Sequence, residues 1–481
     1  MEEGLLLKER EEERNVLTWD VVKEEVKKIG YLAGPMVAVT LSQFLLQLIS
    51  MMMVGHLGEL ALSSAAIATS LTSVTGFSFL LGMAGALETL CGQAYGAQQY
   101  EKLGNYMYSA AICLILLCIP LSIIWVNMGK LLTFIGQDPL ISLEAGKYAA
   151  WLIPALFAYA TLQSQMRYLQ SQSLILPMLL SSFAALCIHI PVCWFLVYKS
   201  ALRTVGAALS IGIAYWLNVI ILALYIKYSS SCEKTRVSLS KGDSKVSARV
   251  LRLAVPDYNG LVETSVLSVW TSSGFSLHET PCAHTPFRLG VLCLTTISFL
   301  YAIPFGVGAA ASTRVANELG AGKPKAARVA VFVVMLLAAT ETTIVSSSLF
   351  LSRHILGYAY SNEKEVADYV TAMVPLICIS VILDSLQGTL SGIARGTGWQ
   401  HLGAYVNLGA FYLVGIPIAV LLSFRQHLGG RGLWIGILMG SVVQVTLLSL
   451  ITGLTNWQQQ AMKAKERISG GILSKENEEE E

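Results

Sequence analysis

Long stretches without Asp, Glu, Lys or Arg alternate with short charged segments along this chain. A helix needs about 20 mostly apolar residues to cross a bilayer. Two stretches qualify if each keeps one acidic residue: 329–352 with Glu341, and 369–394 with Asp384. The other candidates are free of charge and span 29–58, 60–87, 103–129, 148–166, 168–198, 204–226, 289–313, 396–424 and 432–462. The pattern predicts eleven membrane-spanning helices in an all-α polytopic membrane protein.

One region interrupts this regular pattern. A polar loop and then a weakly apolar patch lie between Tyr225 and Arg288, and the longest charge-free stretch there is 264–278. At 1.5 Å per residue a helix of that length covers only ~22 Å of a ~30 Å hydrocarbon core. By itself this patch does not predict a complete membrane span.

The positions of the basic residues predict the orientation and expose this weak span. Of the 33 Lys and Arg residues, 24, among them Arg167 and Arg395, fall on the cytosolic side of the predicted membrane when both termini are cytosolic. Eight fall on the other side, and Arg288 lies in the weakly apolar region. This is the positive-inside pattern. The basic loops 227–252 and 314–328 both belong in the cytosol, so two crossings must separate them. A seventh helix at about 253–280 is therefore required, and it is atypical or defective.

The two halves of the chain repeat each other at a nearly constant offset. Leu253-Ala254-Val255-Pro256 answers Leu32-Ala33-Gly34-Pro35 at offset 221, and Leu319-Gly320-Ala321 answers Tyr95-Gly96-Ala97 at offset 224. Tyr148 and Pro154 answer Tyr369 and Pro375, and Ile190-Pro191 answers Ile416-Pro417. An even number of spans per half makes this a parallel repeat. We expect twelve helices in two pseudo-symmetric six-helix lobes.

The repeat fails in one segment, 257–292. About seventeen residues of the expected seventh helix are missing there. The stretch WTSSGFSLHETPCAHTPFRLGVL (270–292) resembles nothing in the first half. We interpret 257–292 as a substituted segment, from alternative splicing or from an intron translated in a gene model. Natural divergence of one helix is the alternative.

These observations divide the chain into five parts. A cytosolic N-terminal tail (1–28) precedes the N-lobe (29–226, helices 1–6), and a cytosolic interlobe loop (227–252) follows it. The C-lobe (253–462) contains helices 7–12, and an acidic cytosolic C-terminal tail (463–481) ends the chain.

Three acidic residues inside predicted spans are candidate functional groups, because an ionisable side chain in the membrane is costly. Asp384 lies well inside helix 10, where burial disfavours the charged carboxylate and suits proton or cation exchange. A packing role bonded to Gln387 or Ser391 is the alternative. Glu88, near the cytosolic end of helix 2, and Glu341, central in helix 9, are candidates for coupling or for structural hydrogen bonds.

Prolines and polar residues within the spans add candidate bends and cavity positions. Each proline removes a backbone hydrogen bond and favours a bend, whether or not the helix moves. Gln47, Tyr159 and Gln163 are polar side chains that line a site or satisfy one another between helices. The predicted bends are at Pro35, Pro154, Pro191, Pro375 and Pro417.

Other chemistries lack support. No Walker A sequence G-x-x-x-x-G-K-[ST] occurs, and the segments that begin at Gly96 and Gly320 are interpreted as turns with helix caps. The nine cysteines form no C-x-x-C pair, and His278, Glu279, Cys282 and His284 lack the spacing of metal ligands. We therefore expect no enzyme, no cofactor, no metal site and no nucleic-acid partner.

Four long motifs carry a family resemblance. SMMMVGHLGELALSSAAIATS (50–70), ALETLCGQAYGAQQYEKLG (86–104), ASTRVANELGAGKPKAARVA (311–330) and RGTGWQHLGAYVNLGAFYLVGIPIA (395–419) closely resemble plant MATE transporters, the multidrug and toxic compound extrusion family, DETOXIFICATION group. The resemblance covers about 20–460 except 257–292. It implies twelve helices, a central cavity, and export of organic cations or plant secondary metabolites against inward protons.

The resemblance also assigns individual residues. Asp384 matches the acidic position of helix 10 in the C-lobe cavity, whereas the glutamate that plant members place in helix 7 has no counterpart here. We expect a monomeric multi-pass protein of the plasma membrane or the vacuolar membrane. Two hypotheses follow: a proton-coupled antiporter that works by alternating access, and a transport-incompetent splice or gene-model variant of such a transporter.

Overall fold

The computed structural model describes residues 18–236, 300–355, 364–426 and 428–469. Every regular element in these ranges is a helix. Nine helical segments there are long and apolar enough to cross a membrane, and a bent pair adds a tenth. This confirms the all-α polytopic prediction. The predicted seventh helix and the segment 257–292 lie outside the described residues.

The N-lobe contains six spans, and three of them are built from more than one element. The second span joins three elements, the fourth is the bent pair α7–α8, and the fifth ends in a π-helical turn. In chain order the elements are α2 (Trp19–Gly55), α3 (Glu59–Thr72), η1 (Ser73–Phe77), α4 (Ser78–Gly96), α5 (Tyr100–Val126), α6 (Met128–Phe134), α7 (Pro139–Trp151), α8 (Ile153–Ser171), α9 (Ile175–Trp194), η2 (Phe195–Lys199), α10 (Thr204–Tyr228) and η3 (Ser230–Cys232).

The described part of the C-lobe repeats this plan and adds a helix at its end. One span consists of four consecutive elements, α17 to η5, around Pro417. The elements are α13 (Ala302–Gly320), α14 (Pro324–Leu351), α16 (Lys364–Thr397), α17 (Gln400–Leu408), η4 (Gly409–Gly415), α18 (Ile416–Val420), η5 (Leu421–Arg425), α19 (Gly430–Gly453) and α20 (Trp457–Ser469).

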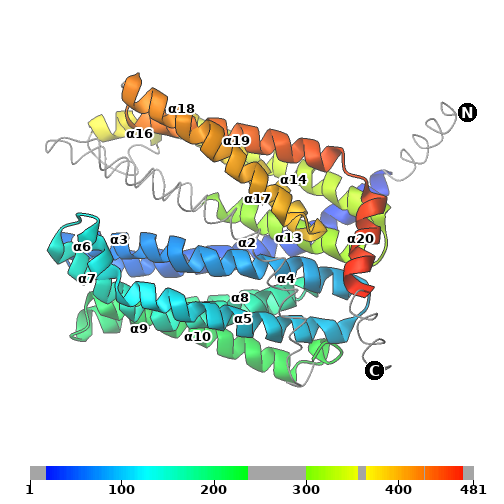
Figure 1. The fold of residues 1–481 in the computed structure, drawn as a ribbon, viewed down its shortest axis with the longest axis horizontal. Helices are drawn as coiled ribbons and strands as arrows, with labels where there is room; N and C mark the ends of the chain where they lie inside the picture. The colour runs from blue at the N-terminus through cyan, green and yellow to red at the C-terminus, as the bar shows by residue number, and fades with distance from the viewer. Residues whose placement is uncertain (1–17, 237–299, 356–363, 427, 470–481) are drawn as a thin grey trace, which may run out of the picture.

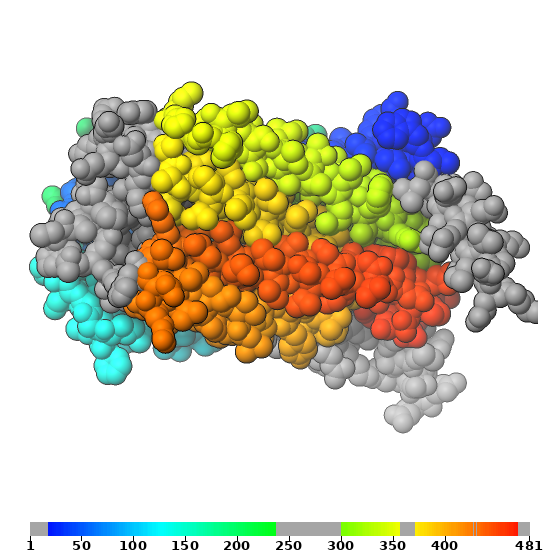
Figure 2. All heavy atoms as spheres, turned by 90° about the horizontal axis from the view of Figure 1, so that it is seen from above, coloured from blue at the N-terminus to red at the C-terminus, as the bar shows by residue number. Residues whose placement is uncertain are grey.

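The two lobes lie side by side, with α2 and α13 in the middle of the molecule (Figure 1). Their main mutual contacts are α13 with α2 and α13 with α4. Helix α20 lies across one end of the bundle, which we call the α20 end (Figure 1). Figure 2 looks onto the C-lobe, where α16 to α20 form one face.

Close backbone contact joins α13 to α16 in the C-lobe. A Cβ atom added at Gly308 would lie 2.5 Å from the carbonyl oxygen of Gly388, and one added at Gly392 would lie 2.1 Å from that of Gly308. No side chain fits at either position, so the two helices approach as closely as small residues permit. The small-residue run that begins at Gly306 therefore joins these helices into one packed unit.

Two helices, α2 and α20, extend beyond the charge-free windows into the predicted tails. Residues 19–28 belong to α2, where Glu25 is 7% exposed, and 463–469 belong to α20, where Ala464 and Ile468 are buried. Charges end a hydropathy window but not a helix: Glu25 pairs with Arg314 of α13, and Lys28 pairs with Glu24 on α2 itself.

The predicted bends occupy varied positions in their helices. Pro154 lies at the start of α8, next to the 43° bend between α7 and α8. Pro35 and Pro375 lie within the continuous helices α2 and α16. Pro191 is followed by the π-helical segment η2, and Pro417 is flanked by η4 and η5. A π-helical turn accommodates the backbone group that a proline leaves unbonded.

Candidate functional site

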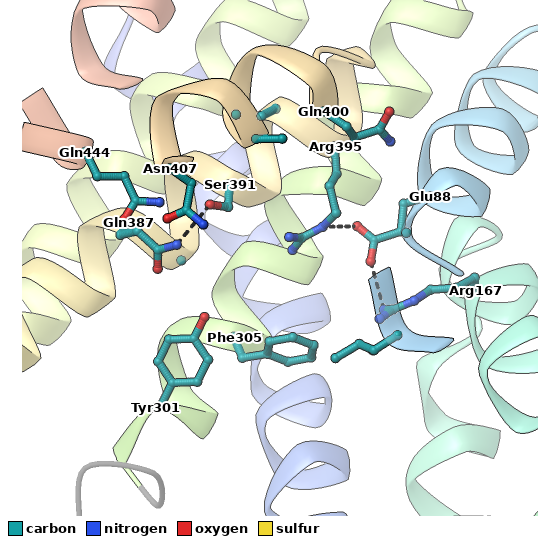
Figure 3. A pocket seen from close by; sticks show the side chains of 16 residues that line it. Glu88, Arg167, Tyr301, Phe305, Gln387, Ser391, Arg395, Gln400, Asn407 and Gln444 are labelled. Atoms are coloured by element: carbon teal, nitrogen blue, oxygen red, sulfur yellow. Dashed lines mark hydrogen bonds and ion pairs between the residues drawn. The ribbon is translucent and has the colours of Figure 1, made fainter. Parts of the chain in front are cut away.

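A pocket lies between the lobes. Six helices line it, and five of them contribute polar side chains. The N-lobe contributes residues of α4 and α8, and the C-lobe contributes α13, α16, α17 and α19 (Figure 3). Its lining comprises Leu81, Gly85, Glu88, Arg167, Tyr301, Phe305, Gln387, Gly388, Ser391, Ala394, Arg395, Gln400, Gly403, Ala404, Asn407 and Gln444.

Glu88 joins three helices at one side of this pocket. Its Oε1 lies 2.9 Å from Nη1 of Arg167 on α8, and its Oε2 lies 3.0 Å from Nε of Arg395 on α16. All three side chains are buried or nearly so, with 2%, 5% and 12% of their areas exposed. The pair with Arg167 lies within the N-lobe, and the pair with Arg395 crosses between lobes (Figure 3).

The two arginines correct the predicted orientation count. Arg167 and Arg395 were assigned to cytosolic connections, but both lie inside helices and pair with a buried carboxylate. The sequence contained a signal for this. Each is a single charged residue between two charge-free stretches, with no further residues to form a loop. An isolated arginine in that position indicates an intramembrane cation rather than a turn.

Side-chain amides continue the connection between lobes toward the α20 end. Gln93 of α4 donates from Nε2 to the carbonyl oxygen of Gly396 at 3.3 Å. Asn317 of α13 donates from Nδ2 to the carbonyl oxygen of Ser171 at 3.1 Å. Gln93 and Asn317 are related by the repeat offset of 224. Each lobe therefore bonds the end of a helix in the other in a pseudo-symmetric way.

The two helices that carry these amides, α4 and α13, approach closely. A Cβ atom at Gly96 would lie 2.0 Å from the carbonyl oxygen of Asn317, and one at Gly320 would lie 2.1 Å from that of Gln93. Neither glycine has a positive φ. Each glycine ends its helix just before the predicted turn and cap, and it also has a packing role, because only glycine permits this contact.

A second ion cluster joins the lobes through α2 and α13. Arg314 of α13 donates from Nε and Nη2 to the two carboxylate oxygens of Glu25 at 2.7 and 3.0 Å. Its Nη2 also lies 2.7 Å from Glu318. We call the contacts of Glu88, Gln93, Asn317, Gly320 and Arg314 across the lobes the interlobe seam. The seam joins the two lobes near the α20 end.

The C-lobe wall of the pocket is rich in uncharged polar groups. Gln387 and Ser391 of α16 are hydrogen-bonded at 3.3 Å, and Asn407 and Gln444 approach them from α17 and α19 (Figure 3). Sequence analysis did not assign Asn407 or Gln444 to a site. Such residues are common in transmembrane helices, and their convergence depends on helix packing.

Asp384 lies one turn from Gln387 on α16, outside the lining of the pocket. Tyr301, which does line the pocket, lies within electrostatic reach of both Asp384 and Arg395. Asp384 forms no ion pair with any residue in the described ranges. Its expected partners Gln387 and Ser391 bond to each other instead.

Glu341 has a nearby partner on the same helix as Asp384. The hydroxyl group of Ser385 donates to Oε2 of Glu341 at 2.6 Å, which joins α14 to α16. This contact fits the structural role that was left open for Glu341. Its partner Ser385 directly follows Asp384 in the chain.

The N-lobe candidates form a separate cluster away from this pocket. Gln47 donates from Nε2 to the hydroxyl group of Tyr215 at 3.4 Å. The ring of Tyr159 lies 5.6 Å from that of Tyr215 and 5.1 Å from that of Phe77. Gln163 is 3% exposed. Gln47 and Tyr159 therefore both contact Tyr215, whereas Gln163 is buried.

No group of three potential metal ligands occurs in the part of the chain that the structure describes. The cluster from His278 to His284 lies outside that part.

A sequence model of the family described as MatE matches residues 35–195 and 290–421, more than half of the chain. The Arabidopsis thaliana protein DETOXIFICATION 14 is 52% identical over 482 residues, covering 100% of this chain and 98% of the relative. DETOXIFICATION 12 from the same plant is 51% identical over 460 residues, covering 94% and 95%.

Solved structures agree with these relatives. The crystal structure of the eukaryotic MATE transporter AtDTX14 matches with a TM-score of 0.89 and 52% identity, covering 93% of this chain and 100% of that chain. An outward-facing multidrug resistance MATE transporter of the MOP superfamily matches with a TM-score of 0.80 at 16% identity, covering 92% and 97%. At that identity the likeness concerns the fold alone.

Proposed function

Because this chain belongs to the MatE family, a family of secondary membrane transporters and not of enzymes, we propose that it is a proton-coupled antiporter working by alternating access. It exports organic cations, xenobiotics or plant secondary metabolites. Its partners are the small-molecule substrate, protons and the lipid bilayer, and it acts as a monomer. It resides in the plasma membrane or the vacuolar membrane with both termini in the cytosol.

The observation that carries this proposal is a polar pocket between two lobes that are joined by separable contacts. The seam between the lobes consists of ion pairs, amide hydrogen bonds and glycine contacts. Rocking of the lobes breaks these contacts without unfolding any helix. The same motion opens the pocket to the α20 end, which faces the cytosol in this proposal.

Helix α16 connects the proton site to the pocket and the seam. Asp384, Gln387, Ser391 and Arg395 follow one another at intervals of three or four residues, which places them on one face of the helix. Asp384 and Arg395 are about 16 Å apart along the axis at 1.5 Å per residue. Movement of α16 with α13 therefore couples the Asp384 region to the seam.

Competition for Asp384 drives exchange in this mechanism. The ionised carboxylate attracts a cationic substrate, and a proton that binds to it removes that attraction. One carboxylate cannot favour both ligands at once, so proton entry releases substrate outside, and the lobes then rock.

The test is efflux from proteoliposomes under an imposed pH gradient. Asp384→Asn removes the titrating group while keeping its size, so we expect gradient-driven efflux to fall by at least about tenfold. Glu341→Gln is the matched control, because its carboxyl group is hydrogen-bonded to Ser385, and it should keep most of the activity. Unchanged pH-driven efflux in Asp384→Asn would show that the proton acts elsewhere.

A second proposal, a transport-incompetent splice or gene-model variant, is supported by the limits of the family match. The two matched stretches end at 195 and 421, which the repeat relates by its offset of 226. The first begins at Pro35, whose repeat partner is Pro256, but the second begins only at 290. The part of the second repeat that the family model does not match therefore coincides with the substituted segment 257–292.

Sequencing the transcript across codons 250–295 tests this second proposal. Reads that lack the codons for 270–292 and encode a complete helix identify the segment as an annotation error. Reads that contain it, together with efflux no faster than from empty vesicles, identify an inactive isoform. Efflux by this exact chain would contradict the second proposal.

A further inference from the structure

Helix α20 lies across the junction of the two lobes, beyond the last membrane span. Its buried side chains, Ala461, Ala464 and Ile468, face the bundle at helical spacing. It contacts α13 and α14 of the C-lobe and α4 of the N-lobe. In Figure 1 it runs across the end of the bundle at which α4 and α13 end and α14 begins. It is not itself one of the candidate membrane spans.

The C-lobe holds α20 at both of its ends. The indole rings of Trp457 and Trp399 have centroids 6.3 Å apart. Arg467 donates from Nη1 to the carbonyl oxygen of Thr397 at 2.8 Å. Gly398 has φ +84°, and a Cβ atom there would lie 2.6 Å from the Arg467 guanidinium group. The loop after α16 is therefore shaped to receive this arginine.

The N-lobe holds the same end of α20 through two polar contacts. Nη1 of Arg467 also donates to Oε1 of Gln93 on α4 at 3.3 Å. Nζ of Lys102, on α5, donates to the carbonyl oxygen of Ile468 at 2.7 Å. The carbonyl groups at a helix C-terminus have no partner within the helix, so a lysine there is a favourable donor.

These contacts connect α20 to the interlobe seam. Gln93 accepts from Arg467 while it donates to the carbonyl oxygen of Gly396 across the seam. One amide side chain therefore joins α4, the end of α16 and α20. If the lobes separate at this end while α20 stays with the C-lobe, two contacts break. Arg467 loses Gln93 of the N-lobe, and Lys102 of the N-lobe loses the carbonyl group of Ile468.

We propose that α20 is an interlobe strap that stabilises the closed α20 end, and that Arg467 and Lys102 are positioning residues of the transport cycle. The strap sets how often the pocket opens toward α20, without touching substrate or proton. This inference rests on the rocking motion in the proposed function, and not on proton coupling or substrate identity. A helix that only anchors the C-terminus to the C-lobe is the competing interpretation.

Thiol labelling of the seam distinguishes an interlobe strap from a helix that only anchors the C-terminus. Ser171, at the end of α8, is 2% exposed and its carbonyl oxygen accepts from Asn317. Ser171→Cys places a nearly isosteric thiol where a maleimide reaches it only when the seam opens. The parent chain, which has its native cysteines, supplies the blank. Purified protein in detergent is used, so neither a proton gradient nor a substrate enters the measurement.

The expected result is faster labelling of Cys at 171 when the strap is weakened. Arg467→Ala and Lys102→Met, each combined with Ser171→Cys, should raise the rate about three- to tenfold, the effect of one or two hydrogen bonds on an equilibrium. Lys465→Ala is the matched control, because this exposed lysine of α20 carries the same charge as Arg467 and Lys102. The labelling rate should not change in this variant.

The outcomes decide the proposal in each case. Unchanged labelling in both strap variants overturns it and leaves α20 as an anchor. If Arg467→Ala does not yield folded protein, Lys102→Met decides alone, since it alters α5 and leaves α20 intact. A failure of Asp384→Asn to affect efflux would contradict the proton assignment but would not change this labelling result.

Discussion

At the scale of single residues, Glu88 is a buried carboxylate that pairs with two arginines. Burial of an ion pair costs free energy that good geometry only just offsets, whereas the loss of one partner leaves a buried charge uncompensated. Glu88 satisfies two arginines that come from different lobes. Its role is therefore both to stabilise the N-lobe through Arg167 and to hold the lobes together through Arg395.

This arrangement predicts a large effect of Glu88→Ala on stability. Removing the carboxylate should cost about 3–5 kcal/mol, because two buried guanidinium groups lose their partner. Glu144→Ala is the control, since the Lys147–Glu144 pair is half-exposed and should contribute at most about 1 kcal/mol. Thermal unfolding of the purified variants measures both. Equal shifts in the two variants would contradict the buried-charge account.

At the scale of elements, both Asp384 and Arg395 lie on the single helix α16. Its position depends on glycine contacts with α13 and on two polar contacts with neighbouring helices. Ser385 bonds Glu341 of α14, and Ser380 accepts from the indole Nε1 of Trp434 on α19 at 3.0 Å. These contacts hold α16 in one register relative to the rest of the C-lobe.

Gly392→Ala tests the contact between α13 and α16. The new methyl group would lie 2.1 Å from the carbonyl oxygen of Gly308, and backbone cannot move aside as a side chain can. We expect a loss of about 1–3 kcal/mol in unfolding free energy. Gly453→Ala, at the end of α19, has open space at the new atom and should change stability little. A tolerated Gly392→Ala would mean that the helices are not locked in register.

At the scale of the whole molecule, contact between the lobes is concentrated in a few groups at the α20 end. Two ion clusters, hydrogen bonds from the side-chain amides of Gln93, Gln170, Asn317 and Gln400, and reciprocal glycines join α2, α4 and α8 to α13, α16 and α17. A seam of this kind opens as a unit, because each contact depends on the same separation between lobes.

Gly320→Ala should bias that separation. Its methyl group would lie 2.1 Å from the Gln93 carbonyl oxygen in the other lobe, so the closed seam loses stability relative to an open one. Labelling of Cys at 171 should accelerate about tenfold or more, in line with a cost of at least about 1.4 kcal/mol for overpacking. Gly453→Ala again serves as the control, and equal rates in the two variants would contradict the closed-seam geometry.

The sequence by itself determined the fold class, most spans, the internal repeat and the family. These properties are local or periodic: a run of twenty apolar residues or a repeated motif is readable without knowing what it touches. It also identified Glu88, Glu341 and Asp384 as acidic residues inside spans, and the structure buries Glu88. Their partners could not be read, because Glu88 and Arg395 are 307 positions apart.

Only the tertiary structure decided which polar groups meet. It placed Arg167 and Arg395 inside helices. It extended α2 and α20 into 19–28 and 463–469. It also gave Gly96 and Gly320 a packing role. It also gathered Gln387, Asn407 and Gln444 in one pocket. Hydropathy records the cost of burying each group, whereas the partner that offsets this cost lies on another helix and is set by packing alone.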